Sequence, residues 1–599
     1  MKLLGLGVFA AGGLSLVRAD LPIHGLMADV LGTWTFTLGA EDSEHPTSCG
    51  GGGPNYNLEN LQPALDNYGA WLESHSQVER KLKLTLTDKL VPGTSEVAPR
   101  NTWNYLAVTV PSQPDTAVGT WTMVYDEGFE VRLPDRRFFA LLKYSRKDAA
   151  ECPRKLNGDN EDAFGETKCY VTDPTRTHIG WTVKEYKENM HLMHTWSCFY
   201  GEKEEAAPEK KSVVLENSAY RLPTLPTLES LTEGLSVPGR WTATVHQQFA
   251  DVSPRDLSLY KGQSGFKKYH PLVDYALPTF LQKDRFGKMD ARKGFPKQAL
   301  TSRFRDRRAS PRTWGDPFLL ESWNPSADRV INQGSCGSCY AVSSAYVLQK
   351  RFEILFNKLF PGANLTAFES PLSAQSILSC SPYNQGCDGG YPFLVGKHAK
   401  EFGFGTEQCQ KYNATHDPRV APCLMNIGSV TRTPEHSAPG CGPGDRWYAK
   451  DYNYVGGFYE GCSEDKMMHE IFHHGPVVVA IDAPDTLFMY HDGLFDSQPP
   501  EHGKICDITK PGFNGWEYTN HAVAVVGWGE EPARGGEKPR KFWVVRNTWG
   551  SDWGNGGYMK MPRGENMAAI ESQAVYFDPD LTRGKAAKLI EQFRKRRDA

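Results

Sequence analysis

The sequence predicts an α+β protein of several domains, and three observations lead to this prediction. The chain has 599 residues, more than one hydrophobic core usually serves. Alternating apolar and polar residues in its first third, as at Leu82, Leu84 and Leu86, are typical of strands. Later, apolar residues recur at helical spacing after Cys339, and β-branched residues follow His521. An all-β part therefore precedes a part built from helices and strands.

The first residues are typical of a secretory signal. An apolar run from Leu3 to Val17 follows Lys2, and its small and apolar end suits cleavage before Asp20. A membrane anchor would need about 20 apolar residues, and no later stretch is long enough to span a bilayer. We therefore expect a secretory-pathway protein that begins at Asp20. Its destination is a lysosome-like vacuole, a secretory granule or the cell exterior.

Cysteines, glycosylation sequons and charge agree with that compartment. Thirteen cysteines in a secreted chain imply disulfides, and the odd number leaves at least one free thiol. Sequons begin at Asn364 and Asn413. The net charge of -4 and the lack of a basic stripe interleaved with aromatic residues argue against a nucleic-acid partner.

The mature chain divides into four parts after the signal of residues 1–19. Residues 20–201 are all-β, and there Phe129 and Val131 alternate with Glu130 and Arg132, which predicts one buried face. Residues 202–310 are rich in charge and proline and form either a removable linking segment or a solvated connector. Residues 311–580 form the mixed unit, and residues 581–599 form a basic tail with a possible short helix.

Cys339 is the candidate nucleophile. It precedes the apolar stripe of an amphipathic helix, formed by Ala341, Ala345, Leu348, Phe352 and Leu355. Unpaired N–H groups and the positive end of the helix dipole favour a thiolate in the first turn. The pair with Cys336 also fits a thioredoxin-like redox motif or half of a zinc site. However, a Gln-Gly loop leads into it and no second Cys-x-x-Cys pair is present, so we expect no metal.

Two later segments provide a base and an orienting group. His521 stands at the start of a β-branched run, and Asn547 ends a second predicted strand, two residues before Trp549. Together with the Cys339 loop, these segments resemble the papain family of cysteine proteases, in Cys, His, Asn chain order. The resemblance implies a two-lobed catalytic domain with a helical lobe and a β-barrel lobe.

The same resemblance implies a role for each residue. Cys339 attacks the scissile carbonyl, and His521 shares and then donates the proton. Asn547 accepts a hydrogen bond from the imidazole and fixes its orientation. Gln333, six residues before the nucleophile, supplies a side-chain amide to the oxyanion hole. Trp549 covers the His–Asn hydrogen bond and shields it from water.

Further segments resemble cathepsin C, the dipeptidyl peptidase I branch of this family. They are Tyr125-Asp-Glu-Gly-Phe-Glu-Val-Arg-Leu, Phe138-Phe-Ala-Leu-Leu-Lys-Tyr144, Trp196-Ser-Cys198-Phe199, Tyr454-Val-Gly-Gly-Phe-Tyr459 and His473-His-Gly-Pro476. The resemblance implies that residues 20–201 form an exclusion domain, an antiparallel β-barrel that closes the cleft beyond the second subsite. The implied activity is removal of dipeptides from free N-termini of peptides and proteins, by a homotetramer.

This resemblance also implies binding residues. Asp20, at the mature N-terminus, pairs with the substrate's α-ammonium group. Gly389 and Gly390 form a bare backbone strip along which an extended substrate pairs. Cathepsin C binds a chloride ion beside its second subsite, and Tyr454 matches a tyrosine of that site. Phe393 stands where another family tyrosine aligns, so one hydroxyl is missing and chloride dependence stays open.

Disulfides follow from the resemblance as well. The implied pairs are Cys336–Cys387, Cys380–Cys423, Cys409–Cys441 and Cys49–Cys198. The family's N-terminal segment carries a cysteine that this chain lacks, which leaves Cys169 to pair with Cys152 instead. The arm that follows Asp20 is then expected to be held by packing alone.

The predicted function is therefore that of a cysteine dipeptidyl aminopeptidase. One alternative is a papain-like endopeptidase whose N-terminal part is only a pro-segment. A second alternative is a secreted, non-catalytic scaffold, against which the full set of Gln333, Cys339, His521 and Asn547 argues.

Overall fold

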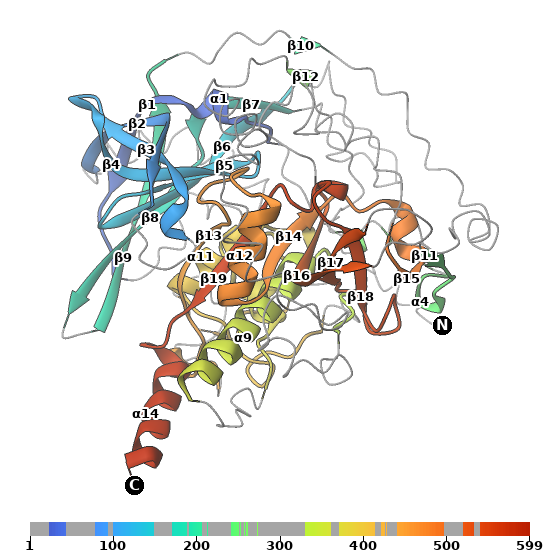
Figure 1. Ribbon diagram of the computed structural model, residues 1–599. Coiled ribbons are helices and arrows are strands. Elements are labelled where there is room, and N and C mark those ends of the chain that lie inside the picture. The colour runs from blue at the N-terminus through green and yellow to red at the C-terminus, as the bar shows by residue number, and fades with distance from the viewer. Residues whose placement is uncertain are drawn as a thin grey trace, which may run out of the picture.

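The computed structural model describes residues 23–43, 78–93, 100–148, 170–188, 191–205, 212–213, 241–250, 252, 257, 259–261, 272–273, 330–360, 370–413, 421–425, 427, 440–495, 519–531 and 539–598. A β-barrel lies beside a larger unit of helices and strands, from which helix α14 (Gly584–Asp598) extends at the C-terminus (Figure 1). This helix confirms the one predicted in the tail. Within the ranges given, no helix is long and apolar enough to cross a membrane. The signal segment and Asp20 lie outside the described residues.

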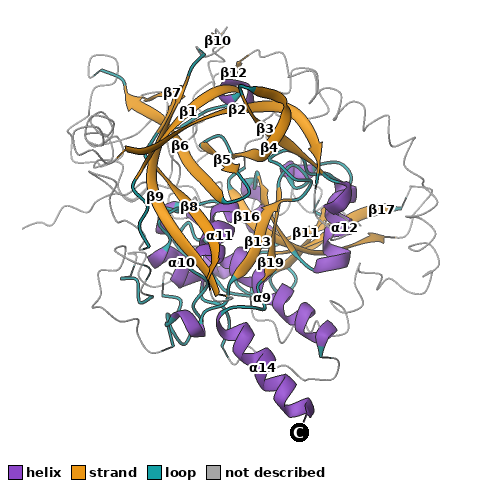
Figure 2. Ribbon diagram, turned by 90° about the vertical axis from the view of Figure 1, so that its left-hand side faces the viewer, coloured by secondary structure: helices purple, strands orange, loops and turns teal. Residues whose placement is uncertain are grey.

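The first domain is a closed antiparallel barrel (Figure 2). Its strands are β1 (Gly32–Gly39), β2 (Val78–Pro92), β3 (Asn104–Val110), β4 (Gln113–Val124), β5 (Gly128–Arg132), β6 (Arg136–Arg146), β7 (Tyr170–Thr177), β8 (Gly180–Glu188) and β9 (His191–Lys203). Neighbouring strands pair around the sheet, and the pairing of β1 with β9 closes it. Leu84 and Leu86 of β2 are buried between more exposed neighbours, as their alternation predicted. The predicted β-barrel is confirmed.

Strand β5 departs from the predicted pattern. Phe129 packs against Trp34 in the barrel core, but Glu130 on the opposite face is also fully buried. The Tyr452 hydroxyl of the larger unit donates to the Glu130 carboxylate at 2.5 Å, and Arg132 donates to it at 2.6 Å. The prediction of one buried face was therefore wrong for this strand, because the neighbouring unit covers the other face.

The larger unit combines a helical part with a six-stranded sheet. Its helices are α9 (Cys339–Leu359), α10 (Ala374–Cys380), α11 (Pro392–Glu401) and α12 (Glu464–His474). The sheet has the order β13 (Ala449–Tyr454), β19 (Ala574–Pro579), β14 (Val477–Ile481), β16 (His521–Glu531), β17 (Arg540–Arg546) and β18 (Tyr558–Pro562). Helix α9 packs against β16 and β19. The helix predicted after Cys339 and the two strands predicted around His521 and Asn547 are confirmed.

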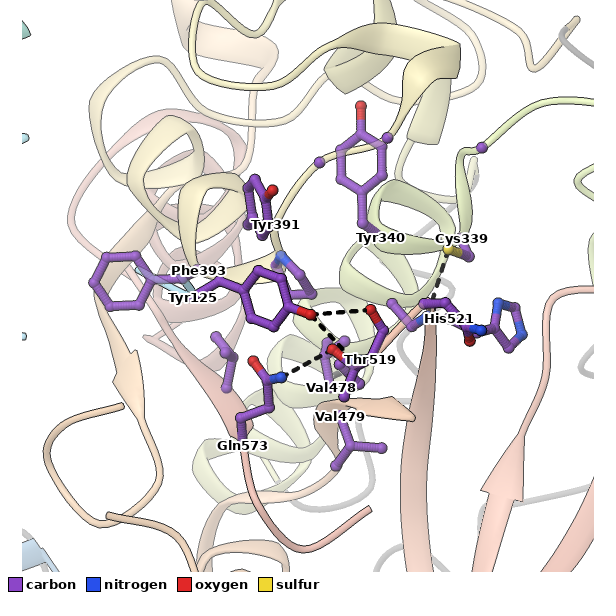
Figure 3. Close-up of a pocket in the computed structure, with 18 of the residues that line it drawn as sticks. Tyr125, Cys339, Tyr340, Tyr391, Phe393, Val478, Val479, Thr519, His521 and Gln573 are labelled. Carbon is purple, nitrogen blue, oxygen red and sulfur yellow. Dashed lines mark hydrogen bonds between the residues drawn. The ribbon is translucent and has the colours of Figure 1, made fainter. Parts of the chain in front are cut away.

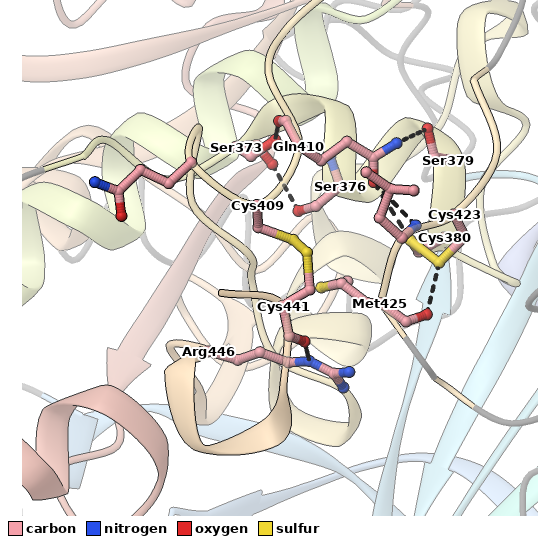
Figure 4. Close-up of a disulfide and its surroundings, with 12 residues drawn as sticks. Ser373, Ser376, Ser379, Cys380, Cys409, Gln410, Cys423, Met425, Cys441 and Arg446 are labelled. Atoms are coloured by element: carbon pink, nitrogen blue, oxygen red, sulfur yellow. Dashed lines mark hydrogen bonds between the residues drawn. A yellow bond between two sulfur atoms is a disulfide. The ribbon is translucent and has the colours of Figure 1, made fainter. Parts of the chain in front are cut away.

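Three disulfides stabilise the helical part. Cys336–Cys387, Cys380–Cys423 and Cys409–Cys441 form as the resemblance implied. Figure 4 shows the last two beside the Gln410 side chain, whose amide nitrogen donates to Ser379 Oγ and to the Pro422 carbonyl. Cys198 is also disulfide-bonded, but Cys49, Cys152, Cys169 and Cys506 lie outside the described residues, so their pairing stays a prediction. Cys339 and Cys462 carry free thiols.

Part of the linking region folds onto the larger unit. Strand β11 (Trp241–Ala243) pairs with β15 (Tyr490–Gly493), and the short helix α4 (Gln247–Ala250) follows. Two two-residue strands, β10 (Ser212–Val213) and β12 (Leu272–Val273), also pair within this region. The side chains of Trp241, Phe249 and Tyr260 are buried. A solvated connector is therefore the wrong description of this part of residues 202–310.

The N-terminal arm is held by polar contacts as well as by packing. Ile23, Leu26 and the short helix α1 (Met27–Val30) bury apolar side chains in the barrel. The His24 ring nitrogen Nδ1 lies 2.7 Å from a carboxylate oxygen of Asp126, which is fully buried. The Gly25 N–H donates to the Asp126 carbonyl at 2.8 Å. The expectation of packing alone was therefore wrong.

Buried ion pairs join the two domains. Arg100, from the loop between β2 and β3, pairs with Glu470 of α12 at 2.6 Å and with Asp578 of β19 at 2.5 Å. Arg351 of α9 contacts the same Glu470 carboxylate at 2.9 Å. Burial alone would raise the pKa of Glu470, but Arg100 and Arg351 outweigh burial and hold that pKa well below its usual value. The carboxylate is therefore charged at neutral pH and fixes the barrel against α12.

We expect Glu470→Gln to destabilise the protein by about 3 kcal/mol at pH 7, because two guanidinium groups lose a buried counter-charge. The folded-state pKa of Glu470 is depressed, so its contribution is present above the unfolded pKa and is lost as pH falls through the folded value. The difference in denaturant midpoint between the variant and wild type should therefore shrink in acid.

Asp115→Asn provides the matched control. Asp115 pairs with Lys89 at 2.8 Å on the surface, where both side chains are exposed. This change should leave the midpoint unaltered. Equal effects of the two substitutions would show that the Glu470 pair does not hold the domains together.

Candidate active site

Cys339 is the first residue of α9, as predicted, and its side chain is only 4% exposed. The Ala522 N–H approaches its sulfur at 3.4 Å. Burial raises the pKa of the thiol to about 11, although N–H groups of Ala522, Tyr340 and Cys339 itself act to lower it. The effect of burial on the thiol pKa therefore exceeds that of the helix N-terminus, which the sequence suggested as the cause of thiolate formation. A thiolate here needs a further positive charge.

His521 is the first residue of β16. Among the described residues that line the pocket, its imidazole is the group that can accept the thiol proton of Cys339. Its Nε2 lies 2.7 Å from Asn547 Oδ1. Burial lowers the pKa of His521 to about 4, while the hydrogen bond to Asn547 acts to raise it. The Trp549 ring stacks on the imidazole at 4.9 Å and is fully buried. The structure thus brings His521, Asn547 and Trp549 together as the sequence predicted.

Gln333 lies in the loop that leads to Cys339, and its amide orientation is fixed. The Thr548 hydroxyl donates to its Oε1, so its Nε2 must face the other way. That nitrogen donates to the Cys336 carbonyl at 2.9 Å and to the Leu259 carbonyl, in the linking region, at 3.3 Å. Gln333 can therefore donate to a carbonyl oxygen beside the nucleophile.

One pocket contains two of these residues together with the predicted glycine strip. Cys339, His521, Gly389 and Gly390 line it together with Tyr125 of the barrel. Figure 3 shows Tyr125 on the side of the pocket opposite Cys339. Gly389 has φ 119°, and a Cβ on Gly390 would lie 2.5 Å from Asn384 Oδ1, so neither position accepts a side chain easily.

Sequence reasoning assigned no role to Tyr125, Thr519 or Gln573, which also line the pocket. Tyr125 belonged to a segment that carried the family resemblance, but nothing local in the sequence indicated that its side chain enters the cleft. Tyr454 and Phe393 do lie in the pocket wall, where their rings stack at 4.8 Å. Asp20 lies outside the described residues, so its position stays a prediction.

Comparisons with known proteins agree with this geometry. Residues 322–577 match the family model described as papain family cysteine protease, and residues 20–203 match the model described as cathepsin C exclusion domain. The chain is a papain-family cysteine protease of the cathepsin C type. The two matches cover the barrel and the larger unit, so this protease carries an exclusion domain on a papain-like catalytic unit.

Similar proteins include a dipeptidyl aminopeptidase and a cathepsin C. Dipeptidyl aminopeptidase 1 of Plasmodium falciparum is 29% identical to the protease over 96% of each chain. Cathepsin C of Schistosoma mansoni is 33% identical over 42% of this chain and 48% of its own. Among solved structures, digestive procathepsin L 3 of Tenebrio molitor matches 59% of this chain and 86% of its own, at 21% identity and a TM-score of 0.36.

The linking region covers one end of the active site of the protease. Besides the bond from Gln333 to Leu259, the Trp549 indole N–H donates to the Tyr260 carbonyl at 2.9 Å. The Phe249 ring lies 5.8 Å from the Trp549 ring and 5.1 Å from the Phe488 ring. The segment therefore accepts a hydrogen bond from the Gln333 side-chain amide and packs against the Trp549 ring, which stacks on His521.

We expect Asn547→Ala to slow the alkylation of Cys339 at neutral pH by roughly tenfold to a hundredfold. The reason is that a hydrogen bond to a charged imidazolium is worth about 1.5–3 kcal/mol, or about one to two pKa units. Without it the pKa of His521 falls further, so less imidazolium is available to stabilise the thiolate. The rate constant for reaction with iodoacetamide measures this directly.

Asn555→Ala is a suitable control for that experiment, because Asn555 is exposed and its amide bonds Asp492 at 3.2 Å, away from the pocket. It should react at the wild-type rate. An Asn547→Ala rate equal to wild type would mean that this hydrogen bond does not support the thiolate.

Proposed function

We propose that the protease is a dipeptidyl aminopeptidase that uses Cys339, His521 and Asn547 to remove two residues at a time from free N-termini. One observation carries this proposal: Tyr125 of the exclusion domain lines the same pocket as Cys339 and His521. A barrel docked so close to the nucleophile limits how far a substrate extends on that side. This favours an exopeptidase over the alternative endopeptidase.

Because burial disfavours either charge alone, we propose that the proton passes from the Cys339 thiol to His521 and creates both charges together. The thiolate then attacks the substrate carbonyl carbon and forms a C–S bond. The developing oxyanion accepts hydrogen bonds from Gln333 Nε2 and from the backbone N–H of Cys339.

The imidazolium of His521 next gives its proton to the leaving amine as the C–N bond breaks. Water, deprotonated by the same imidazole, attacks the thioester carbonyl and releases the dipeptide, and the proton returns to the sulfur. Asn547 keeps the ring in place during both steps, and Trp549 keeps water from its hydrogen bond. Gly389 and Gly390 let the substrate backbone approach closely.

Asp20 is our candidate for the group that receives the substrate's α-ammonium. Support comes from the arm that follows Asp20. In this arm His24 contacts Asp126, and Asp126 is the residue next to Tyr125, which lines the cleft. Blocking the amine would leave a carboxylate without its partner in a closed site, and such losses are large.

A chloride ion fits the pocket wall only in part. Phe393 has no hydrogen-bond donor, so of these two residues only Tyr454, whose oxygen accepts a backbone hydrogen bond from Tyr125, has an O–H to donate. The guanidinium carbon of Arg132 lies 5.5 Å from the Phe393 ring centroid. We therefore propose that any chloride dependence is weak.

The disulfides fit a secretory or lysosomal location. Which compartment receives the protease, and whether it assembles into tetramers as the resemblance implied, stay predictions. The linking region is our candidate for an activation propeptide, because its Leu259 carbonyl takes up a hydrogen bond from the proposed oxyanion donor.

Substrates with and without a free amine test the proposed activity. We expect a free-amine dipeptide amide to be turned over by the processed protease at least about 10²-fold faster than its N-acetylated form, because acetylation removes the partner of a buried charge. The measurement is kcat/KM for both substrates.

Two variants accompany this comparison. Cys339→Ala should abolish both activities, and Asp20→Ala should raise KM for the free amine and reduce the ratio between the substrates. Preference for the acetylated substrate would favour the endopeptidase, and absence of any thiol-dependent turnover would favour the scaffold. An unchanged ratio in Asp20→Ala would remove the anchor role.

Inhibition by the linking region is tested with Phe249→Ala. Truncating this buried ring removes contacts worth about 3–5 kcal/mol to segment docking, so we expect the unprocessed chain to gain activity by at least about tenfold. Thr242→Ala, an exposed position in the same segment, should change nothing. After proteolytic removal of the segment, both variants should match wild type. Equal activity of unprocessed wild type and Phe249→Ala would contradict the inhibitory role.

A further inference from the structure

A single turn of the exclusion domain contacts the N-terminal arm and two parts of the cleft. The turn contains Tyr125, Asp126 and Glu127 and joins β4 to β5. Tyr125 has φ 52°, in the left-handed region that favours glycine and asparagine and disfavours a bulky side chain. Such a conformation persists only where surrounding contacts impose it, and it concentrates at functional sites. The left-handed conformation of Tyr125 therefore points to a functional role for the contacts of this turn.

The Tyr125 hydroxyl bonds both backbone polar groups of Thr519, a residue close to the proposed base. It accepts a hydrogen bond from the Thr519 N–H at 3.1 Å and donates to the Thr519 carbonyl at 3.4 Å. Thr519 lies two residues before His521. These bonds connect positions 394 residues apart in the chain, from the barrel to the segment that leads into β16.

Other contacts hold the rest of this segment. Gln573 Nε2 donates to Thr519 Oγ1 at 3.0 Å, and the Asn520 N–H donates to the Ile481 carbonyl at 2.9 Å. Both come from the catalytic unit and fix the segment from the sheet side. The Tyr125 hydroxyl is the contact that fixes the Thr519 backbone from the barrel side.

The two residues after Tyr125 contact the N-terminal arm and the residue that follows the glycine strip. Asp126 binds His24 of the N-terminal arm. Glu127 accepts a hydrogen bond at 2.8 Å from the hydroxyl of Tyr391, which directly follows the glycine strip. One turn therefore contacts the arm, the residue after the glycine strip and the segment that leads to His521.

We propose that Tyr125 is a positioning residue for His521, through which docking of the exclusion domain sets the geometry of the proposed catalytic pair. The role rests on the proposed function of His521. It differs from a role as a passive wall of the second subsite, because a wall affects substrate binding whereas a positioning residue affects the reactivity of Cys339 without substrate.

Tyr125→Phe removes the hydroxyl and keeps the ring, which lies 5.8 Å from the Tyr391 ring and 6.3 Å from the Tyr459 ring. We expect kcat for a free-amine dipeptide amide to fall roughly tenfold, with KM within about twofold of wild type. We also expect alkylation of Cys339 by iodoacetamide at neutral pH, in the absence of substrate, to slow by a similar factor.

Tyr448→Phe is the matched control. The Tyr448 hydroxyl is also buried and donates to a backbone carbonyl, that of Pro443 at 3.2 Å, but it lies outside the pocket. It should retain wild-type kcat, KM and alkylation rate. If Tyr125→Phe folds poorly by thermal melting, Tyr125→Asn provides the second variant. Asparagine suits the left-handed backbone and is too short to bond Thr519, so alkylation of Cys339 in the absence of substrate should slow by a similar factor.

The outcomes separate the two proposals. Unchanged kcat and alkylation in Tyr125→Phe, or a change in KM alone, would overturn the positioning role while the wild type still released dipeptides. If the wild type released none but alkylation still slowed in Tyr125→Phe, the proposed activity would be wrong and the positioning role would stand. Slower alkylation together with lower kcat supports both.

Discussion

The cost of burying charge is the constraint on which the active site depends. The surroundings of Cys339 and His521 raise the pKa of the thiol and lower that of the imidazole, so each group alone prefers to be neutral. The two charged forms become favourable only when they appear together. Everything that fixes one group relative to the other therefore affects reactivity, which explains why a hydrogen bond to Asn547 and a stacked Trp549 surround the imidazole.

The same constraint governs the contact between the exclusion domain and the catalytic unit. Glu130 and Glu470 are fully buried. Glu470 pairs with two arginines, and Glu130 pairs with one arginine and accepts a hydrogen bond from a tyrosine hydroxyl. Such pairs contribute little net free energy compared with apolar contacts of the same size, but breaking one is costly. An interface of this kind therefore favours one orientation of the barrel strongly over others. That orientation places Tyr125 in the cleft.

Local patterns in the sequence predicted the catalytic unit well. The helix after Cys339 and the strands next to His521 and Asn547 follow from periodicity, and the family resemblance supplied three disulfides that the structure contains. The contacts of the turn at Tyr125 could not be predicted, because Thr519, His24 and Tyr391 are distant in sequence and no local pattern encodes their meeting. Glu130 was misjudged for a related reason. Alternation describes one sheet face, whereas burial of the other face depends on a second domain.

The exclusion domain and the linking region contact the active site from different directions. Leu259 and Tyr260 contact Gln333 and Trp549, whereas Tyr125 contacts Thr519, on the other side of His521 in the chain. Both the linking region and the exclusion domain thus contact the surroundings of the His521 imidazole. The linking region contacts Trp549, which stacks on the ring, and the exclusion domain contacts the backbone of Thr519. Removing the linking region frees the Gln333 amide and uncovers Trp549 but leaves the Tyr125 contact in place. Because the barrel and the catalytic unit still hold the segment before His521, removing the linking region need not reorganise the proposed catalytic pair; it only has to clear the space in front of it.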